Sequence, residues 1–198
     1  KKEGNRLRYG LIDIGSNTIR GVVYEAEGTS FKELITKKEF TGILNYIEDG
    51  CLNDAGLLVL KETVARLFSF CRLLNCAETH AFATASLRNL QNGPAVLAKL
   101  AQEGLTVRLL SAKEEAACDF YGLLAAGCPD NGLGFDLGGG SCQIFTYEKI
   151  RLQQSVSLPM GSLAMYNSFV RGILPTQKER KAIAKFAQKQ LAPYSFLS

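Results

Sequence analysis

The stretch LIDIGSNTIRGVVYE, residues 11–25, decides the fold, because a related stretch, GFDLGGGSCQIFTYE, follows at residues 134–148. The two align at a constant offset of 123 residues, so that Asp13 falls on Asp136. Each reads as an apolar β-run that ends in an acid, a turn of small residues and a second β-run. The sequence therefore predicts a duplicated α/β fold with two facing glycine-containing loops. The turn-forming run Pro129-Asp130-Asn131-Gly132 marks the boundary between the copies.

The rest of the chain alternates between strand and helix patterns. A third β-run, 31–40, precedes a long amphipathic helix from about 53 to 74, for which Asn53 is the N-cap candidate. The remaining expected elements are strands at 78–84, 105–110 and 153–157 and helices at 94–102, 111–127, 162–170 and 176–191. This alternation is typical of an α/β layer structure. It predicts a complete first lobe, residues 1–128, with five strands, and a truncated second lobe, residues 129–198, with three.

The composition is that of an ordinary globular protein, with 46% hydrophobic and 21% charged residues. No apolar run is long enough for a membrane helix, and the charged start, Lys1-Lys2-Glu3-Gly4-Asn5-Arg6, does not resemble a signal peptide. Since the chain does not begin with Met, we expect a piece of a longer protein or an engineered form. A net charge of +4 is too small to indicate nucleic acid binding. We therefore expect a cytoplasmic protein that binds neither nucleic acid nor a membrane.

The cysteine and histidine content limits the kinds of catalytic and metal site that the chain can form. The six cysteines are scattered, with no C-x-x-C pair, which favours reduced and mostly buried thiols over a disulfide framework or a zinc site. The single histidine, His80, lies in the apolar run Thr79-His80-Ala81-Phe82, which favours a packed strand residue over a catalyst. Ser-His-Asp catalysis and histidine-rich metal sites are thereby nearly excluded.

The sharpest motif is Asp136-Leu137-Gly138-Gly139-Gly140-Ser141. Three consecutive glycines let the backbone approach a ligand closely, and the N–H groups of such a loop form an anion cradle to which Ser141 adds a hydroxyl. A plain glycine-rich hairpin is the alternative, but it needs fewer glycines and no preceding acid. The motif lacks the Gly-Lys-Ser/Thr of a P-loop, and a strand rather than a helix follows it. We therefore predict a phosphate-binding loop.

The companion loop of the first copy carries side-chain donors. Its run Ser16-Asn17-Thr18 can hydrogen-bond a phosphate, and Arg20 can form a bidentate pair with one. Taken alone it would be a polar turn, but with the second loop it makes a two-sided phosphate clamp. Asp13 and Asp136 would then point at one cleft, and carboxylates beside phosphates are ligands that Mg²⁺ prefers.

Two further segments offer candidate site residues. Arg88 follows a strand end, where it is either a phosphate ligand or a solvated arginine. Ser111 and Glu114 have capping-box spacing, which accounts for Glu114 as a helix-start acid. Glu115 is not needed for the box, so it is either a second helix-start acid or a carboxylate that activates water for attack on phosphorus.

Five segments in this order, DIGSNTIR, ATASLRN, LLSAKEEA, FDLGGGS and VSLPMGS, resemble the exopolyphosphatase / guanosine pentaphosphate phosphohydrolase (Ppx/GppA) family over about residues 9–170. The resemblance implies the duplicated ribonuclease-H-like fold of the actin, sugar-kinase and heat-shock ATPase superfold. It implies a hydrolase that removes the terminal phosphate of inorganic polyphosphate or of guanosine pentaphosphate (pppGpp) with Mg²⁺.

Position by position, the resemblance implies that Glu115 is the catalytic base and that Asp136 is linked to the metal. It makes Gly138, Gly139, Gly140 and Ser141 the phosphate cradle, with Ser16, Asn17, Thr18 and Arg88 opposite. The sequence departs from the family at Ser111-Ala112, where Ser-Gly is usual, and at Gln143, where the family has a Glu that helps to hold metal or water. It also lacks the later Gly-Gly-Thr motif of the second domain. Gln143 supplies one charge fewer to the site, so we expect poor turnover or a high Mg²⁺ requirement.

Three functions follow from these observations. The leading hypothesis is an exopolyphosphatase or pppGpp phosphohydrolase, an acid-anhydride hydrolase that depends on magnesium. The alternative is a catalytically weakened phosphate or alarmone sensor that keeps the cradle. A phosphotransferase of the same superfold is disfavoured, since no sugar-binding pattern is evident. The sequence leaves open the choice between polyphosphate and pppGpp, and whether the full-length protein is a homodimer.

Overall fold

The computed structural model describes residues 6–197. Most of the charged start discussed above, residues 1–5, lies outside the described residues. The chain divides into two compact units, Lys1–Leu110 and Ser111–Ser198. The second unit begins with helix α4 (Ala112–Ala125), because this helix packs against the strands that follow it. These units are defined by contacts, whereas the predicted lobes were defined by the sequence repeat. The lobe limits at residues 128 and 129 therefore stay a prediction.

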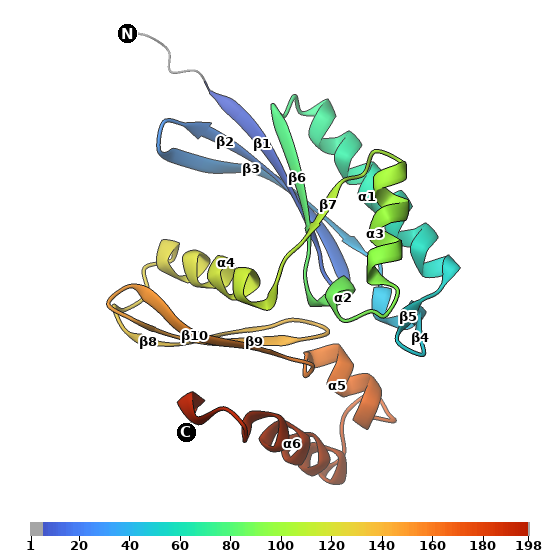
Figure 1. Ribbon diagram of the computed structural model, residues 1–198, viewed down its shortest axis with the longest axis vertical. Coiled ribbons are helices and arrows are strands. Elements are labelled where there is room, and N and C mark those ends of the chain that lie inside the picture. Colours follow the sequence, from blue (N-terminus) through green and yellow to red (C-terminus); the bar gives the residue numbers. More distant parts are fainter. Residues whose placement is uncertain (1–5, 198) are drawn as a thin grey trace. The chain divides into compact units, whose positions relative to one another are not determined.

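The first unit is built on a five-stranded mixed sheet in the order β3-β2-β1-β6-β7. Its strands are β1 (Leu7–Ile14), β2 (Thr18–Glu27), β3 (Ser30–Phe40), β6 (Glu78–Ala83) and β7 (Val107–Leu109). The first three are antiparallel, whereas β1, β6 and β7 run parallel. Helices α1 (Asp54–Leu73) and α3 (Gly93–Gln102) lie along one face of this sheet (Figure 1) and bury the apolar core against it. Asn53 caps α1, as predicted.

Four short elements of the first unit were not predicted. The 3₁₀ helix η1 (Ile43–Tyr46) and the two-residue strands β4 (Ile47–Glu48) and β5 (Cys51–Leu52) connect β3 to α1. The single-turn helix α2 (Ala85–Arg88) follows β6. Elements of two to four residues are too short to produce a hydrophobic period in the sequence.

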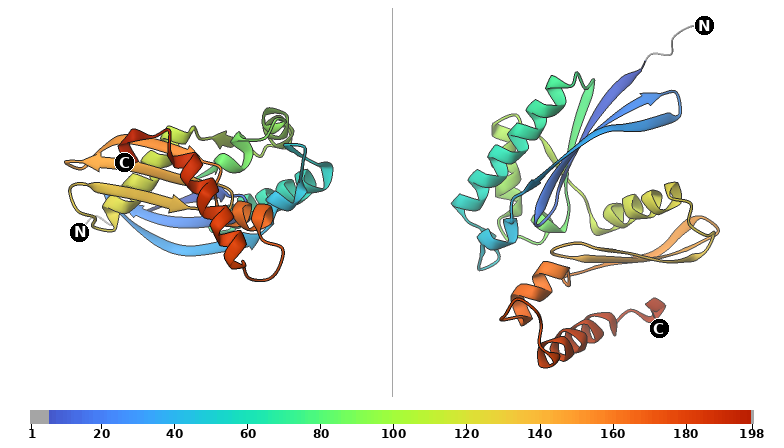
Figure 2. Two further views of the ribbon diagram at one scale, coloured as in Figure 1. Left: turned by 90° about the horizontal axis from the view of Figure 1, so that it is seen from below. Right: turned by 180° about the vertical axis from the view of Figure 1, so that it is seen from behind.

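The second unit places a three-stranded antiparallel sheet, β10-β9-β8, between helices. The elements that follow α4 are β8 (Gly132–Leu137), β9 (Cys142–Glu148), β10 (Arg151–Leu158), α5 (Ser162–Phe169), α6 (Gln177–Leu191) and the 3₁₀ helix η2 (Ser195–Leu197). Phe145 and Tyr147 pack against Phe120 of α4, whereas Ile144 belongs to a cluster that includes Leu191 of α6. Alternate residues of β9 thus cover opposite faces, with α4 on one side and α6 on the other (Figures 1 and 2).

The strand register confirms the sequence repeat. In β1 and β2, Asp13 lies opposite Arg20, and in β8 and β9, Asp136 lies opposite Gln143. These four positions are related by the same offset that aligns the two sequences. Each unit therefore contains the same strand, turn and strand, paired at the same positions.

Two expectations about individual residue types are wrong. His80 lies on β6, as predicted, but its side chain is 51% exposed, pairs with Glu78 at 3.0 Å and lies outside the core. The strand alternates, and Ala81 and Ala83 take the buried positions. The cysteines are all free, but only Cys71 and Cys142 are buried.

Within residues 6–197, no helix has both the length and the apolar character that crossing a membrane requires.

Candidate functional site

The glycine loop of the second unit is a tight turn held from one side by α5. The Gly138 N–H donates to the Ser141 carbonyl at 3.0 Å and closes the turn. The Ser162 N–H donates to the Gly138 carbonyl at 2.9 Å, and the Ala164 N–H donates to the Gly139 carbonyl at 2.9 Å. These bonds fix the loop carbonyls towards the start of α5, so the loop has a defined shape before any ligand binds.

Gly161 makes this close packing possible. A Cβ atom at Gly161 would lie 2.5 Å from the backbone carbon and oxygen of Gly139 and 2.5 Å from the carbonyl carbon of Gly140. The sequence reasoning quoted the segment VSLPMGS for the family resemblance and missed this role. The signal was present, since a glycine directly before a helix occupies a position where Ser, Thr, Asp or Asn is usual.

Two N–H groups of the loop remain available. Among the described residues, those of Gly139 and Gly140 have no hydrogen-bond acceptor. Adjacent free N–H groups in a tight turn form a concavity for an anion. The geometry thus fits the predicted phosphate-binding loop, which is also a hairpin turn between β8 and β9.

Gln143 is a buried residue of β9 beside this loop. Asp136, Gln143 and Ser157 lie opposite one another across β8, β9 and β10, so their side chains share one face of the sheet. Gln143 is 1% exposed, and its Nε2 donates to the Ser141 hydroxyl at 3.0 Å and to the Ser157 hydroxyl at 3.1 Å. The sequence singled out position 143 for the carboxylate it lacks, whereas the structure shows the amide holding two hydroxyls.

The pKa of the Cys142 thiol is affected by the carboxylate at this end of the sheet. Burial raises the pKa of the Cys142 thiol, and the carboxylate of Asp136 raises it further. Cys142 is therefore a neutral, packed side chain at neutral pH and not a nucleophile.

Glu115 and Glu114 have separate roles at the start of α4. Ser111 and Glu114 form the predicted capping box, with the Ser111 N–H and hydroxyl donating to Glu114 at 2.9 and 2.8 Å. Glu115 takes no part in the box and is only 8% exposed. The first residues of α4 lie towards the glycine-loop end of the sheet (Figures 1 and 2). Within the second unit, Glu115 is therefore at the same end as the loop.

The first-unit loop repeats the arrangement. The Gly15 N–H donates to the Thr18 carbonyl at 3.1 Å. The Asn17 carbonyl accepts from the N–H groups of Thr41 and Gly42, both at 2.9 Å. As in the second unit, N–H groups of the segment that follows the third strand donate to the loop carbonyls. Ser16, Asn17 and Thr18, the predicted phosphate donors, are residues of this turn.

The other first-unit candidates lie at the edge where the parallel strands end. The buried Ser86 hydroxyl donates to the Ile14 carbonyl at 2.6 Å and ties the segment after β6 to the end of β1. Arg88 is half-buried and its Nη1 donates to the Leu110 carbonyl at 2.8 Å, so it is not a solvated arginine. Asp13 and Arg20 are exposed neighbours on β1 and β2. The sequence reasoning missed Ser86, although it lies in the quoted segment ATASLRN.

The carboxylates suit a metal that arrives with phosphate. Among the described residues, no group of three or more His, Cys, Asp or Glu side chains could hold an ion. Each unit instead places one aspartate, Asp13 or Asp136, at the strand end that leads into its loop. Mg²⁺ commonly takes one or two carboxylates and completes its shell with water and substrate phosphates, so this donor set fits it.

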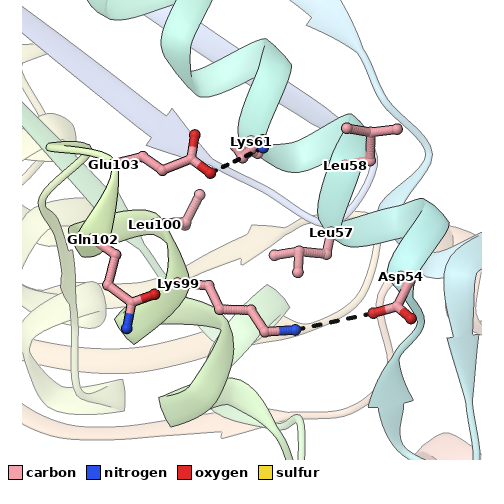
Figure 3. A pocket seen from close by; sticks show the side chains of 8 residues that line it. All are labelled: Asp54, Leu57, Leu58, Lys61, Lys99, Leu100, Gln102 and Glu103. Carbon is pink, nitrogen blue, oxygen red and sulfur yellow. Dashed lines mark hydrogen bonds and ion pairs between the residues drawn. The ribbon is translucent and has the colours of Figure 1, made fainter.

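A separate cavity of about 260 Å³ lies between α1 and α3 in the first unit (Figure 3). An ion pair between Lys61 and Glu103 at 2.9 Å and one between Lys99 and Asp54 at 4.0 Å span the two helices beside it. The lining residues are Asp54, Leu57, Leu58, Lys61, Lys99, Leu100, Gln102 and Glu103. None of them is a predicted site residue.

Comparison with known proteins places the chain among phosphatases. The model of the Ppx/GppA phosphatase family matches residues 22–196. Exopolyphosphatase 1 of Mycobacterium tuberculosis is 27% identical over 165 residues, which are 79% of this chain and 47% of the relative. The chain thus spans about half the length of the curated relatives it matches.

Solved structures show the same fold. An exopolyphosphatase from Cytophaga hutchinsonii matches with a TM-score of 0.86 at 19% identity, over 94% of this chain and 61% of that one. The Aquifex aeolicus member of the Ppx/GppA family matches with a TM-score of 0.75 at 21% identity, over 95% of this chain and 62% of that one. The predicted duplicated ribonuclease-H-like α/β fold is thereby confirmed.

Proposed function

The chain belongs to the Ppx/GppA phosphatase family, and from this premise we propose that it is part of a Mg²⁺-dependent phosphohydrolase. The substrate is inorganic polyphosphate or guanosine pentaphosphate, and the product is one terminal phosphate. The observation that carries the proposal is the glycine loop, whose shape α5 fixes and whose Gly139 and Gly140 N–H groups are available to an anion. The six free thiols favour the cytoplasm as its compartment.

In this proposal the protein binds phosphate mainly through fixed dipoles and charges. The N–H groups of Gly139 and Gly140 in the Gly138–Gly140 loop and the Ser141 hydroxyl donate to phosphate oxygens in the second unit. The run Ser16-Asn17-Thr18, with Arg20 and Arg88, supplies donors in the first. Asp13 and Asp136 would hold Mg²⁺, which supplies positive charge to the phosphate oxygens. Such preorganised stabilisation is the main catalytic contribution in phosphoryl transfer.

Glu115 is the proposed general base. A water oxygen attacks the terminal phosphorus, the bond to the bridging oxygen breaks, and a water proton passes to the Glu115 carboxylate. Two observations support Glu115 over Glu114 for this task. Glu114 is committed to the capping box, whereas Glu115 takes no part in it and is buried.

The test is phosphate release from polyphosphate and from guanosine pentaphosphate by the full-length protein, with Mg²⁺ and with EDTA. Glu115→Gln should lower kcat by about 100-fold or more, the usual contribution of a general base, and leave substrate binding nearly intact. Glu114→Gln is the matched control, because a glutamine at this position still accepts in the capping box and should retain activity. Equal losses in the two variants would remove Glu115 from the mechanism.

One observation favours a binding protein as the second candidate. At position 143 a neutral amide, whose Nε2 donates to two serine hydroxyls, stands where the resemblance implies a carboxylate. A protein that lacks this charge could keep the cradle and lose turnover. Tight binding of guanosine pentaphosphate by the full-length protein, without phosphate release at any Mg²⁺ concentration, would identify such a sensor.

A further inference from the structure

Strand β3 forms one edge of the first-unit sheet, where only β2 lies beside it (Figure 1). Along its eleven residues, the backbone N–H and C=O groups that point away from β2 have no partner strand among the described residues. Such an edge can accept a further strand. The edge is also apolar, since four large hydrophobic side chains of β3 are between 40% and 78% exposed: Phe31, Leu34, Ile35 and Phe40.

A β-bulge divides β3 into two halves. Tyr24 of β2 lies opposite Glu33, whereas Val23 lies opposite Ile35, so Leu34 is an extra residue on the β3 side. The extra residue changes the alternation of side chains along the strand. One face of β3 therefore carries odd-numbered residues before the bulge and even-numbered residues after it: Phe31, Glu33, Thr36, Lys38 and Phe40.

The two halves of β3 are complementary to each other when a second copy of the strand lies antiparallel to it. With a two-fold axis at Thr36, the bulge of each copy lies opposite Lys37 of the other copy, and side chains of the same face meet at every position. Outside the bulges the axis produces three kinds of pair, each of which occurs twice: Glu33 with Lys38, Lys32 with Glu39, and Phe31 with Phe40. Without the bulge the same axis would set Glu33 opposite Glu39, and like charges directly opposite destabilise a sheet. The bulge thus makes the edge self-complementary.

The charged side chains of this edge are available for such pairs. Among the described residues, Lys32, Glu33 and Lys38 form no ion pair, and Glu33 accepts a hydrogen bond from the Thr36 hydroxyl at 2.8 Å. Glu39 is shared, since it pairs with Lys37 at 3.2 Å and with Arg66 at 3.5 Å.

The same charges select one arrangement of the two strands. Lysines on an edge strand usually prevent association with other strands. In the register centred on Thr36, Lys32 and Lys38 both meet a carboxylate, whereas a shift of two residues in either direction removes these pairs. Opposite charges, two aromatic rings and two threonines are each favourable cross-strand pairs. The partner that fits this edge best is therefore a second copy of the edge itself.

We propose that the edge of β3 is a docking surface for a second copy of this chain, which joins two five-stranded sheets into one continuous sheet. A single pair of strands is a small interface, so the dimer is reversible and forms at micromolar or higher concentrations. Its exposed charge pairs are screened by salt, so the dimer weakens as the ionic strength rises. No predicted site residue lies on β3, so the proposal is independent of the proposed function.

The first test measures the dimer Kd of the full-length protein by sedimentation equilibrium. Glu33→Lys and Lys38→Glu should each raise this Kd about tenfold, because each replaces two attractive charge pairs by two repulsive ones. The double variant Glu33→Lys/Lys38→Glu exchanges the charges and should return the Kd to within about threefold of the wild-type value. Lys185→Glu, at an exposed position of α6, is the control for the change in net charge and should leave the Kd unchanged.

The second test identifies the surface. In this register Phe31 of one copy lies beside Phe40 of the other, whereas the two copies of Phe31 are about 30 Å apart along the strands. A short bis-maleimide should therefore link Phe31→Cys to Phe40→Cys when the two full-length variants are mixed. Neither variant alone should be linked to itself beyond the level of the wild type, which is the control because Cys118 is exposed.

Three outcomes overturn the proposal. The first is a full-length protein that stays monomeric up to about 100 µM, well above the range expected for an interface of this kind. The second is a dimer that both single charge variants weaken and the double variant does not restore. The third is a dimer whose Kd none of the charge variants changes and in which Phe31→Cys is not linked to Phe40→Cys, because such a dimer forms through another surface.

Discussion

Gly161→Ala tests whether the packing of α5 sets the shape of the glycine loop. Gly161 has φ −68° and ψ 160°, a conformation open to alanine, so the substitution does not strain the backbone locally. Its whole effect comes from the added methyl group, which would lie 2.5 Å from backbone atoms of Gly139 and Gly140. Backbone atoms cannot rotate away as the end of a side chain can.

The expected size follows from these distances. Carbon atoms are in comfortable contact at about 3.5 Å, so the loop and α5 must separate by about 1 Å. Such overpacking costs about 1–3 kcal/mol, and it stretches the bonds from Ser162 and Ala164 to the loop carbonyls. A 1 Å displacement of binding groups lowers turnover by about 100-fold. We therefore expect a Tm several degrees lower and a large loss of phosphate release.

Gly122→Ala is the matched control for this experiment. Gly122 lies in α4 with nothing within 4 Å of the position of its Cβ. Alanine there should leave activity unchanged and stabilise the helix by up to about 1 kcal/mol. Thermal unfolding and phosphate release should be measured on both variants of the full-length protein. Wild-type turnover and Tm in Gly161→Ala would refute the reasoning.

Three other substitutions probe separate parts of the structure. Gln143→Glu should raise activity at low Mg²⁺ more than at saturating Mg²⁺, because it adds a carboxylate beside Asp136; an unchanged Mg²⁺ dependence would show that position 143 does not handle metal. Ser86→Ala removes the donor to the Ile14 carbonyl and should lower the free energy of unfolding in urea by about 1–3 kcal/mol, a loss that Ser86→Thr should partly restore. Burial raises the pKa of the Cys71 thiol from 9.0 to about 11, so as the pH rises the thiol ionises in the unfolded state before it ionises in the folded state. The free energy of unfolding of the wild type should therefore fall between these two pH values, and it should fall less in Cys71→Ser, measured by urea unfolding across this pH range.

The sequence predicted the repeat, the order of the main strands and helices, and the two loops. These features depend on neighbours along the chain, because hydrophobic period, capping residues and turn residues act over a few positions. The capping box of Ser111 and Glu114 shows this, since every atom it needs lies within one helical turn. The resemblance to the family rested on the same local segments, and the family match confirmed it.

Contacts between residues far apart in the sequence could not be predicted from these local patterns. Which side of β6 carries His80 depends on where α1 packs, and the role of Gln143 depends on Ser157, fourteen residues away on another strand. Ser86 bonds a carbonyl 72 residues away, and Gly161 is required by a loop of the neighbouring hairpin. Hydrogen bonds and steric contacts depend on distance in space. The type of a residue does not by itself indicate which distant residue it will contact. The chain's local pattern therefore fixed its elements and loops, whereas only tertiary packing decided which distant residues hold those loops in shape.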